Sequence, residues 1–399
     1  MVDVGIIGSG IIGLSLAREL ASRGLSTRVL TREPASETTS WAASGIFPPA
    51  PDWPTAGPAD RLTTLSDRLH WQWHEELLEE TGIDNGLAAC GGLYLAVDEA
   101  GAARLRTEAD AWRSRGCDLA WLSNDDIRRA EPGLAPAATS GLFSGAYLLP
   151  AESQIRPPRH LKALLESCRQ RGVEIVSDTS VTAIDCDQGR ISIVHSLTGD
   201  HTAGMWVLAG GAWSAIFAEV FGRAVVPRPV RGQIALLRQS SPSLSRIVNV
   251  GLEYLVPRPD GRVLVGSTLE DAGFDLGTTE PAIQRMLQFA RRLVPELTQA
   301  DVEKTWSGMR PGSPDGLPWI GRSPNVSNGF VATGHFRAGW HQSPGTARLL
   351  ADLMTGATPP IDPTPYAVDR GTTTSGTTTS DSTLAMVQRA AADIASIQW

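Results

Sequence analysis

The first thirteen residues form a short apolar segment that leads directly into the glycine pattern Gly8-Ser-Gly10-Ile-Ile-Gly13. A helix-period stretch follows, then Gly24 as a C-terminal cap and a second apolar segment over residues 26–31. In such an arrangement Gly8 permits a tight turn, Gly10 lets a phosphate approach the backbone, and Gly13 lets the helix pack closely on the sheet. The triplet alone is a weak signal, but between a strand and a helix it predicts a dinucleotide-binding unit.

The end of the second predicted strand departs from the usual pattern of such units. An acidic residue about 20 positions after the glycines normally accepts hydrogen bonds from the ribose hydroxyls. This chain has Thr31 at that place, followed by Arg32 and Glu33. The Thr31 hydroxyl and the Glu33 carboxylate are both able to reach a ribose oxygen, and Arg32 is able to lie along the adenosine. The sequence leaves open which of the three binds the nucleotide.

The composition is that of a globular protein large enough for two or three cores. The chain has 399 residues, of which 42% are hydrophobic and 20% charged. Its formal charge of -8 argues against nucleic acid or an anionic membrane as a partner. No apolar run approaches the roughly 20 residues that span a bilayer, and Asp3 and the early glycines are unlike a signal peptide, so we expect a cytoplasmic protein. The oligomeric state stays open, and a homo-oligomer is compatible with the sequence.

The four cysteines give no sign of a metal site. Cys90, Cys117, Cys168 and Cys186 are far apart and match no metal-binding spacing. We therefore interpret them as reduced structural thiols and expect no bound metal.

Apolar periodicity divides the rest of the chain into helices and strands. Helical spacing predicts helices at residues 61–81, 99–116, 124–131, 155–172, 281–294 and 346–353. Extended or alternating patterns predict strands at residues 90–97, 173–177, 180–185, 206–214, 225–239, 244–257, 262–268 and 329–333. Residues 38–47 are small, hydroxylated and broken by glycine, which predicts a loop on which a flat or anionic group can lie.

These patterns predict an α/β protein in which a Rossmann-like nucleotide-binding domain is interleaved with an antiparallel-sheet (α+β) substrate domain. The chain visits the nucleotide-binding domain in three segments, residues 1–88, 151–220 and 306–365. The intervening segments, residues 89–150 and 221–305, form the substrate-binding domain. Residues 366–399 form a Thr/Ser-rich linker and a tail, in which residues 383–398 are expected to be helical.

Beyond the N-terminal glycines, five segments follow in order: the loop 39–46, Trp206-Val-Leu-Ala-Gly-Gly-Ala-Trp-Ser214, Tyr254-Leu-Val-Pro257, Gly308-Met-Arg-Pro-Gly-Ser-Pro-Asp-Gly-Leu-Pro318 and Gly334-His-Phe-Arg337. With these motifs the chain resembles the D-amino-acid-oxidase superfamily of flavoenzymes, and within it glycine oxidase and the sarcosine-oxidase-like amine oxidases. The resemblance spans about residues 3–366, and its two C-terminal motifs are far more specific than the glycines.

The resemblance implies noncovalent FAD, oxidation of an amine CH–NH bond to an imine, and reoxidation by O2. Some relatives attach flavin through a C-terminal cysteine, but no cysteine follows Cys186 here, which excludes that linkage. By position, Thr39 and Ser40 meet phosphate or ribitol and Val181 meets adenine. The full set of expected FAD-binding residues is Gly8, Gly10, Ile11, Ile12, Gly13, Thr31, Arg32, Thr39, Ser40, Ser44, Gly45, Ile46, Val181, Gly210, Trp213, Arg310, His335, Phe336, Arg337, Ala338, Gly339, Trp340 and His341.

Arg310 is the expected binding group for the carboxylate of an amino acid substrate. A planar guanidinium offers two parallel charge-assisted hydrogen bonds, where a lysine offers a point charge. Arg310 follows a strand-like segment and precedes a Pro/Gly-rich turn, so we expect it at a strand end, where ligands bind in α/β sheets. The resemblance adds Tyr254 as a second carboxylate contact and Arg337 as a residue that closes the site or contacts the flavin. Orientation then aims the Cα hydrogen at the flavin, and no acid–base residue is required.

The substrate itself is less defined by the sequence. Residues 338–342 read Ala-Gly-Trp-His-Gln, where glycine-oxidase-type relatives have an apolar Asn-Gly-Ile-Leu-like run, and Leu252 replaces a histidine of some relatives. We therefore hypothesise an N-substituted glycine whose apolar N-group lies under Trp340, with imine hydrolysis to glyoxylate and an amine.

Two alternatives remain at this stage. The first is a D-amino-acid or sarcosine dehydrogenase that uses an electron acceptor other than O2. The second is a non-catalytic flavin-binding protein that contacts a partner through residues 383–398. A flavin monooxygenase is disfavoured, because Gly334-His335 stands where such enzymes carry a Gly-Asp pair.

Overall fold

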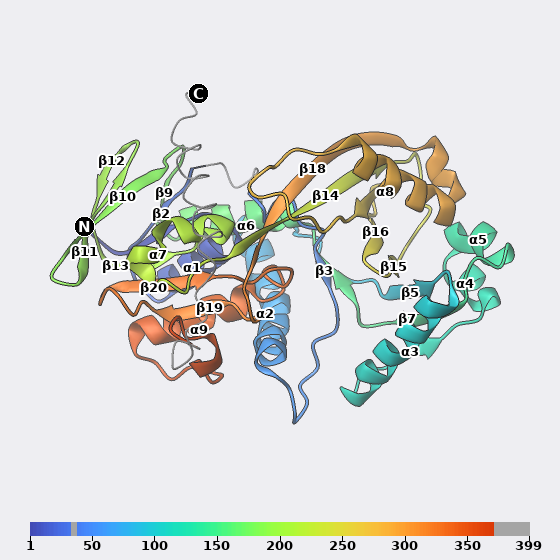
Figure 1. Cartoon of the computed structure of the whole chain (residues 1–399), viewed down its shortest axis with the longest axis horizontal. Helices are drawn as coiled ribbons and strands as arrows, with labels where there is room; N and C mark the ends of the chain where they lie inside the picture. The colour runs from blue at the N-terminus through green and yellow to red at the C-terminus, as the bar shows by residue number, and fades with distance from the viewer. Residues whose placement is uncertain (33–37, 371–399) are drawn as a thin grey trace.

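The computed structural model describes residues 1–32 and 38–370. One of the two parts of the molecule is built on a six-stranded sheet, whose strand order is β19-β20-β13-β1-β2-β9 and whose strands come from distant segments of the chain (Figure 1). The strands are β1 (Val2–Ile7), β2 (Thr27–Leu30), β9 (Glu174–Val176), β13 (Ala203–Leu208), β19 (Trp319–Arg322) and β20 (Gly329–Thr333). All pairs are parallel except β19–β20, so the loops after β1, β2, β13 and β20 emerge at one edge of the sheet. This is the edge at which parallel α/β sheets bind ligands.

Four helices cover one face of this sheet and form its main core. They are α1 (Ile11–Ser22), α2 (Pro58–Thr81), α6 (Pro157–Gln170) and α9 (Ser343–Thr355). Helix α1 packs between α9 and α6, and its apolar residues are buried on nearly every side, including Leu14, Leu16 and Leu20. The other face is covered by the small antiparallel sheet β10 (Val181–Asp187), β11 (Arg190–Ser196) and β12 (Gly199–His201), together with α7 (Ala218–Phe221) and the 3-10 helix Gly211–Phe217.

The other part of the molecule is built on an eight-stranded sheet in the order β18-β14-β17-β16-β15-β5-β7-β6. Its strands are β5 (Gly92–Ala96), β6 (Ala120–Trp121), β7 (Gly145–Leu149), β14 (Arg228–Arg238), β15 (Ile247–Val250), β16 (Glu253–Pro257), β17 (Arg262–Gly266) and β18 (Asp301–Gly312). Helices α3 (Glu99–Ser114), α4 (Asn124–Ala130), α5 (Ala135–Thr139) and α8 (Glu280–Leu293) pack on it. Strands β3 (Ile46–Phe47), β4 (Ala88–Ala89) and β8 (Ser153–Gln154) form a third, short sheet.

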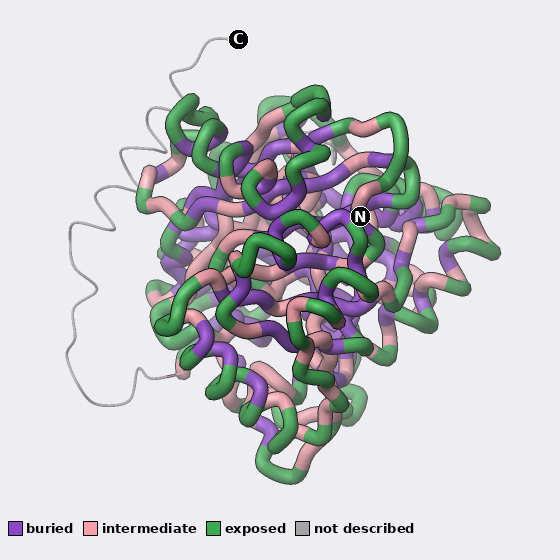
Figure 2. The backbone as a smooth tube through the Cα atoms, turned by 90° about the vertical axis from the view of Figure 1, so that its right-hand side faces the viewer, coloured by how far each residue is buried: buried purple, intermediate pink, exposed green. Residues whose placement is uncertain are grey.

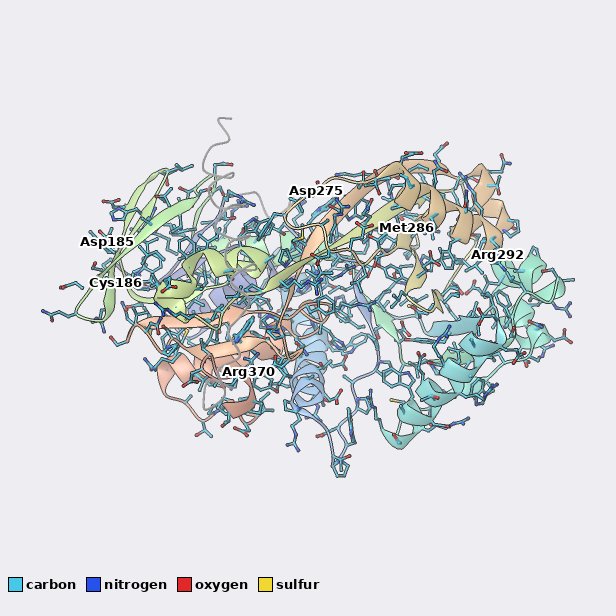
Figure 3. All side chains as sticks on the ribbon, in the orientation of Figure 1. Asp185, Cys186, Asp275, Met286, Arg292 and Arg370 are labelled. Atoms are coloured by element: carbon cyan, nitrogen blue, oxygen red, sulfur yellow. The ribbon has the colours of Figure 1, made fainter. Side chains whose placement is uncertain are left out.

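Burial follows this two-part architecture. Buried segments run through the interior, and exposed ones lie on the outer turns and helix faces (Figure 2). Residues at the periphery include Cys186 on β10 and, at the far side of the other half, Arg292 on α8 (Figure 3). The four cysteines are free thiols, and Cys168 is fully buried in the core between α1 and α6. Among the described residues, no helix combines the length and apolarity that crossing a bilayer requires.

The predicted α/β class with its parallel sheet and a separate antiparallel sheet is confirmed. The single strand predicted over residues 244–257 is wrong, because Gly251, at φ +61°, makes a turn between β15 and β16. Strand β18 crosses residue 306, where we placed the third nucleotide-domain segment, and pairs with β14 on both sides of that position. The domain division remains a prediction, and the tail 383–398 lies outside the described residues.

Candidate active site

A cavity of about 730 Å³ joins the two halves of the molecule. One end is formed by the loops after β1, β2 and β13, and the other by β5, β14, β15, β16 and β18 of the eight-stranded sheet. The lining includes every predicted cofactor and substrate residue except Gly13 and Gly45. These two lie behind the wall, where side chains would collide with backbone: a Cβ at Gly13 would lie 1.9 Å from the Gly8 oxygen, and one at Gly45 would lie 2.3 Å from the Ile155 oxygen.

The first end is shaped for a pyrophosphate. Helix α1 begins at Ile11, and its N-terminal residues line the cavity. Gly10, at the N-cap position, has no side chain that could cover the first backbone N–H groups of the helix. Gly8 turns the chain at φ +115°, and a Cβ there would lie 2.4 Å from the Ala209 oxygen. Backbone N–H groups at a helix N-terminus stabilise anions through hydrogen bonds and the helix dipole. The residues present therefore fit a dinucleotide cofactor.

The nucleotide end beyond this cradle is lined by Thr31, Arg32 and Val181. The Thr31 hydroxyl is buried and lies 2.6 Å from the Ser9 hydroxyl, where the usual acidic residue would stand. The Arg32 guanidinium lies over the Trp213 ring, 4.8 Å from its centroid. Both residues thus remain candidates for adenosine contacts, and Glu33 lies outside the described residues.

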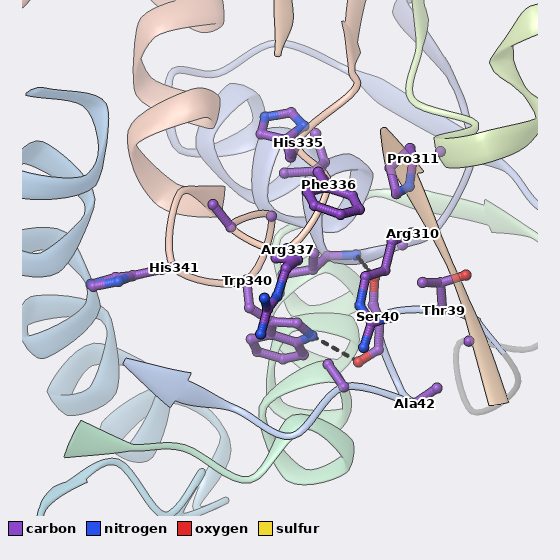
Figure 4. Close-up of a pocket in the computed structure, with 18 of the residues that line it drawn as sticks. Thr39, Ser40, Ala42, Arg310, Pro311, His335, Phe336, Arg337, Trp340 and His341 are labelled. Carbon is purple, nitrogen blue, oxygen red and sulfur yellow. Dashed lines mark hydrogen bonds between the residues drawn. The ribbon is translucent and has the colours of Figure 1, made fainter. Parts of the chain in front are cut away.

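The loop over residues 38–47 lies along the middle of the cavity and is fixed from both sides. The Ser40 hydroxyl accepts a hydrogen bond from Ile11 N at 2.9 Å, and the Thr39 hydroxyl accepts one from Met309 N at 3.2 Å. The Trp340 indole donates to the Ser40 carbonyl at 2.8 Å (Figure 4). Trp340 is only 7% exposed and packs in the core, so it holds this loop and offers little surface to a substrate.

Arg310 reaches the cavity from inside an antiparallel strand. As expected, Arg310 lies near a strand end, two residues before β18 ends at Gly312. The strand belongs to the antiparallel sheet rather than to the parallel one, because β18 pairs with β14 along its length. The guanidinium donates to the Ser267 hydroxyl at 2.9 Å and to the Thr268 carbonyl at 3.2 Å. Both of these acceptors are neutral, and among residues 1–32 and 38–370 no carboxylate pairs with Arg310, so its positive charge is available to a ligand. Burial lowers its pKa, and the charge of Arg337 acts in the same direction.

Gly232 of β14 makes room for this guanidinium. A Cβ added to Gly232 would lie 2.1 Å from Arg310 Nη1 and 2.4 Å from Nη2, so the planar group rests directly on the glycine backbone. Gly266 plays the same part for Tyr254, since its added Cβ would lie 2.5 Å from the phenol oxygen. The side chains of Arg310 and Tyr254, the two residues predicted to bind the substrate carboxylate, thus each pack directly against the backbone of a glycine.

Arg337 extends into the cavity beside Arg310, and both side chains point the same way (Figure 4). The two neighbouring histidine side chains are directed elsewhere. His335 Nε2 lies 2.9 Å from the Thr346 hydroxyl, and burial lowers the His335 pKa to about 3. His341 stacks on Phe47 and contacts Asp67 of α2 at 3.0 Å. Both histidines therefore have structural contacts rather than a position for proton transfer.

A group of polar residues at the far end of the cavity was not predicted from the sequence. Glu152 lies in the turn between β7 and β8 and is fully buried. Its Oε1 accepts a hydrogen bond from Asn249 Nδ2 at 3.3 Å, and within the described residues its Oε2 makes none. Burial raises the pKa of Glu152 to about 7, although Tyr94 and Asn249 oppose this shift by hydrogen bonding. Tyr94, Glu152 and Asn249 all line the same cavity as Arg310.

This pKa predicts a pH-dependent stability that Glu152→Gln should remove. The folded protein keeps the Glu152 proton from pH 4.5 to about 7, where the unfolded chain has released it, so folding is penalised increasingly as pH rises through this range. Between pH 5 and pH 8 the unfolding free energy of the unmodified protein should fall about 2 kcal/mol further than that of the variant. Urea unfolding at both pH values measures this. Parallel pH profiles of the two proteins would show that the carboxyl group is not perturbed.

A nucleotide cradle that shares one cavity with arginine side chains is the arrangement of a dinucleotide-dependent oxidoreductase. Residues 3–353 match the FAD dependent oxidoreductase (DAO) family, and the chain belongs to this family. This confirms the predicted superfamily and its cofactor, FAD.

Two glycine oxidases align with more than nine-tenths of this chain. Glycine oxidase of Pseudomonas aeruginosa is 34% identical over 364 residues, which cover 91% of this chain and 97% of that protein. The crystal structure of glycine oxidase from Geobacillus kaustophilus aligns with a TM-score of 0.85 and 32% identity, covering 92% of this chain and 98% of the other. A hydrogen cyanide synthase subunit, HcnC, of Pseudomonas aeruginosa is 35% identical over 77% of this chain and 73% of its own length.

Proposed function

We propose that this enzyme oxidises glycine or an N-substituted glycine at the α-carbon. The observation that carries the proposal is the Arg310 guanidinium, which lies without a carboxylate partner within the described residues and shares a cavity with the nucleotide cradle. Similarity to two glycine oxidases supports an amino acid of this size. The predicted products are glyoxylate and ammonia or a primary amine, after hydrolysis of the imine.

The residues of this chain would act by binding and orientation. Arg310 and Tyr254 would hold the substrate carboxylate, and Arg337 would add positive charge from the opposite loop. FAD, when bound, supplies the acceptor for the hydride. The loop 38–47, the cradle at Gly8–Ile12 and the residues that follow β20 would hold the cofactor. A fixed carboxylate leaves the neighbouring C–H bond with few orientations, which is the main source of acceleration here.

A substrate panel tests this function. Purified protein should form glyoxylate from glycine, sarcosine or a longer N-alkylglycine, and should form hydrogen peroxide in equal amount if O2 is the acceptor. Glyoxylate with an artificial dye but without peroxide would instead favour the dehydrogenase alternative. Absence of flavin bleaching with every amine under anaerobic conditions would overturn the proposal and favour a binding role.

A further inference from the structure

We propose that Tyr94, Asn249 and Glu152 form a second subsite, which binds a cationic amine at the far end of the substrate. The inference rests on the proposed function, because it specifies the N-substituent of the glycine. The preferred substrate would be an N-substituted glycine whose substituent ends in an ammonium group.

The position of this subsite follows from the strand register. Tyr94 pairs with Asn249 across β5 and β15, and Asn249 pairs with Tyr254 across β15 and β16. Directly opposed residues on neighbouring strands share a face of the sheet, and the strands lie about 4.8 Å apart. Asn249 and Tyr94 are therefore one and two strands away from Tyr254 along one cavity wall. A substrate carboxylate held at Arg310 and Tyr254 would direct a long substituent along this row.

The contacts with Glu152 leave Asn249 and Tyr94 with oxygen atoms that can accept hydrogen bonds from a ligand. Asn249 donates its Nδ2 to Glu152 Oε1, so its own amide oxygen is left to accept. The Tyr94 hydroxyl also interacts with the Glu152 carboxyl group, and both burial and that negative charge raise the Tyr94 pKa. The half-buried Asn249 and Tyr94 therefore offer acceptors to the cavity, backed by a carboxylate. An ammonium group is the ligand that satisfies such a set.

No cationic side chain forms an ion pair with Glu152 in the part of the chain that the structure describes. Its Oε2 is fully buried without a hydrogen bond, and it lies so close to Gly92 that an added Cβ would be 2.0 Å away. A buried carboxylate without a partner is costly unless it is protonated or meets a cation. A ligand ammonium would complete the pair, so that Arg310 would hold one end of the ligand and Glu152 the other. Arg115 also lines this cavity, but its guanidinium lies over the Trp53 and Trp112 rings, and within the described residues it forms no ion pair with Glu152.

Unreactive ligands separate this inference from the catalytic proposal. ω-Amino carboxylates of increasing length carry both charges but no α-amine, and straight-chain carboxylates of equal length lack the ammonium group. Titration of the flavin-containing protein, followed by calorimetry and by the visible spectrum, gives both affinities. At one or more lengths we expect the ω-amino carboxylate to bind at least tenfold more tightly, and Glu152→Gln to reduce this preference below twofold. Glu79→Gln, which removes an exposed acid of α2 outside the cavity, should retain it.

The possible results of this titration distinguish a failure of the subsite from a failure of the proposed function. Equal binding of both ligand series by the unmodified protein would overturn the subsite but leave the Arg310 contact intact. Failure of every carboxylate to bind would instead contradict the proposed function. If Glu152→Gln does not fold, Asn249→Leu tests the same subsite from the cavity surface, and a retained preference in that variant would overturn the inference. In turnover, N-(ω-aminoalkyl)glycines should exceed matched N-alkylglycines in kcat/KM only when Glu152 is present.

Discussion

Arg310→Ala should lower kcat/KM for the preferred amino acid about a thousandfold. The substitution removes the cation that meets the substrate carboxylate in a partly buried site, and leaving one partner of such a pair alone costs about 4 kcal/mol. The loss should appear in kcat as well as KM, because the carboxylate contact also orients the α-carbon. Steady-state kinetics with glycine and with the best N-substituted glycine measure the effect.

The conservative variant Arg310→Lys separates charge from geometry. Lysine retains the positive charge but lacks the planar pair of donors, and it cannot keep both bonds to Ser267 and Thr268. We expect an intermediate activity and weaker binding of simple carboxylate inhibitors. Flavin content and the visible spectrum should stay unchanged in both variants. A kcat/KM within threefold of the unmodified enzyme for Arg310→Ala would remove this residue from the site.

The N-terminal unit was predictable because its determinants are local. A strand, a glycine turn and a helix within twenty-two residues define the cradle, and the glycines fix its shape wherever the rest of the chain lies. In the half built on the eight-stranded sheet, α3, α4 and α8 were equally readable from their spacing, whereas the short helix α5 was not predicted. Sheet order was not, since β13 pairs with β1 from about 200 residues along the chain, and β20 pairs with β13 from about residue 330. Such pairings depend on which apolar faces cover each other, and the local periodicity of a sequence does not indicate this.

In the candidate site, too, the residue within a local motif was predicted, and the residues that distant strands bring to it were not. Arg310 was found through a motif, but its supports come from other strands: Gly232 from β14, and Ser267 and Thr268 from the segment after β17. The Glu152 group had no signal at all, because its three members are separated by about 60 and 100 positions and no two belong to one motif. A buried acid in a turn becomes visible only when the residues that surround it are known.

Gly232→Ala should lower kcat/KM about a hundredfold while the protein stays folded. The added methyl would lie 2.1 Å from Arg310 Nη1, and the atom that must move is the end of a flexible side chain rather than backbone. The guanidinium would shift by about 1 Å, a displacement that costs about a hundredfold when it misaligns a substrate. Thermal unfolding should change little, since no backbone atom is displaced and Gly232 has an ordinary strand conformation. Kinetics and unfolding are measured on the same preparation.

Gly312→Ala is the matched control, because it makes the same substitution in the neighbouring strand β18. Its added Cβ would meet its nearest atom at 3.4 Å, an ordinary contact, and Gly312 does not line the cavity. Its kcat/KM should remain within twofold of the unmodified enzyme. If Gly232→Ala behaves like this control, the guanidinium does not need its present position, and Arg310 would act through charge alone. If Gly232→Ala instead approaches Arg310→Ala, the bare backbone of one glycine is as necessary for carboxylate recognition as the arginine that rests on it.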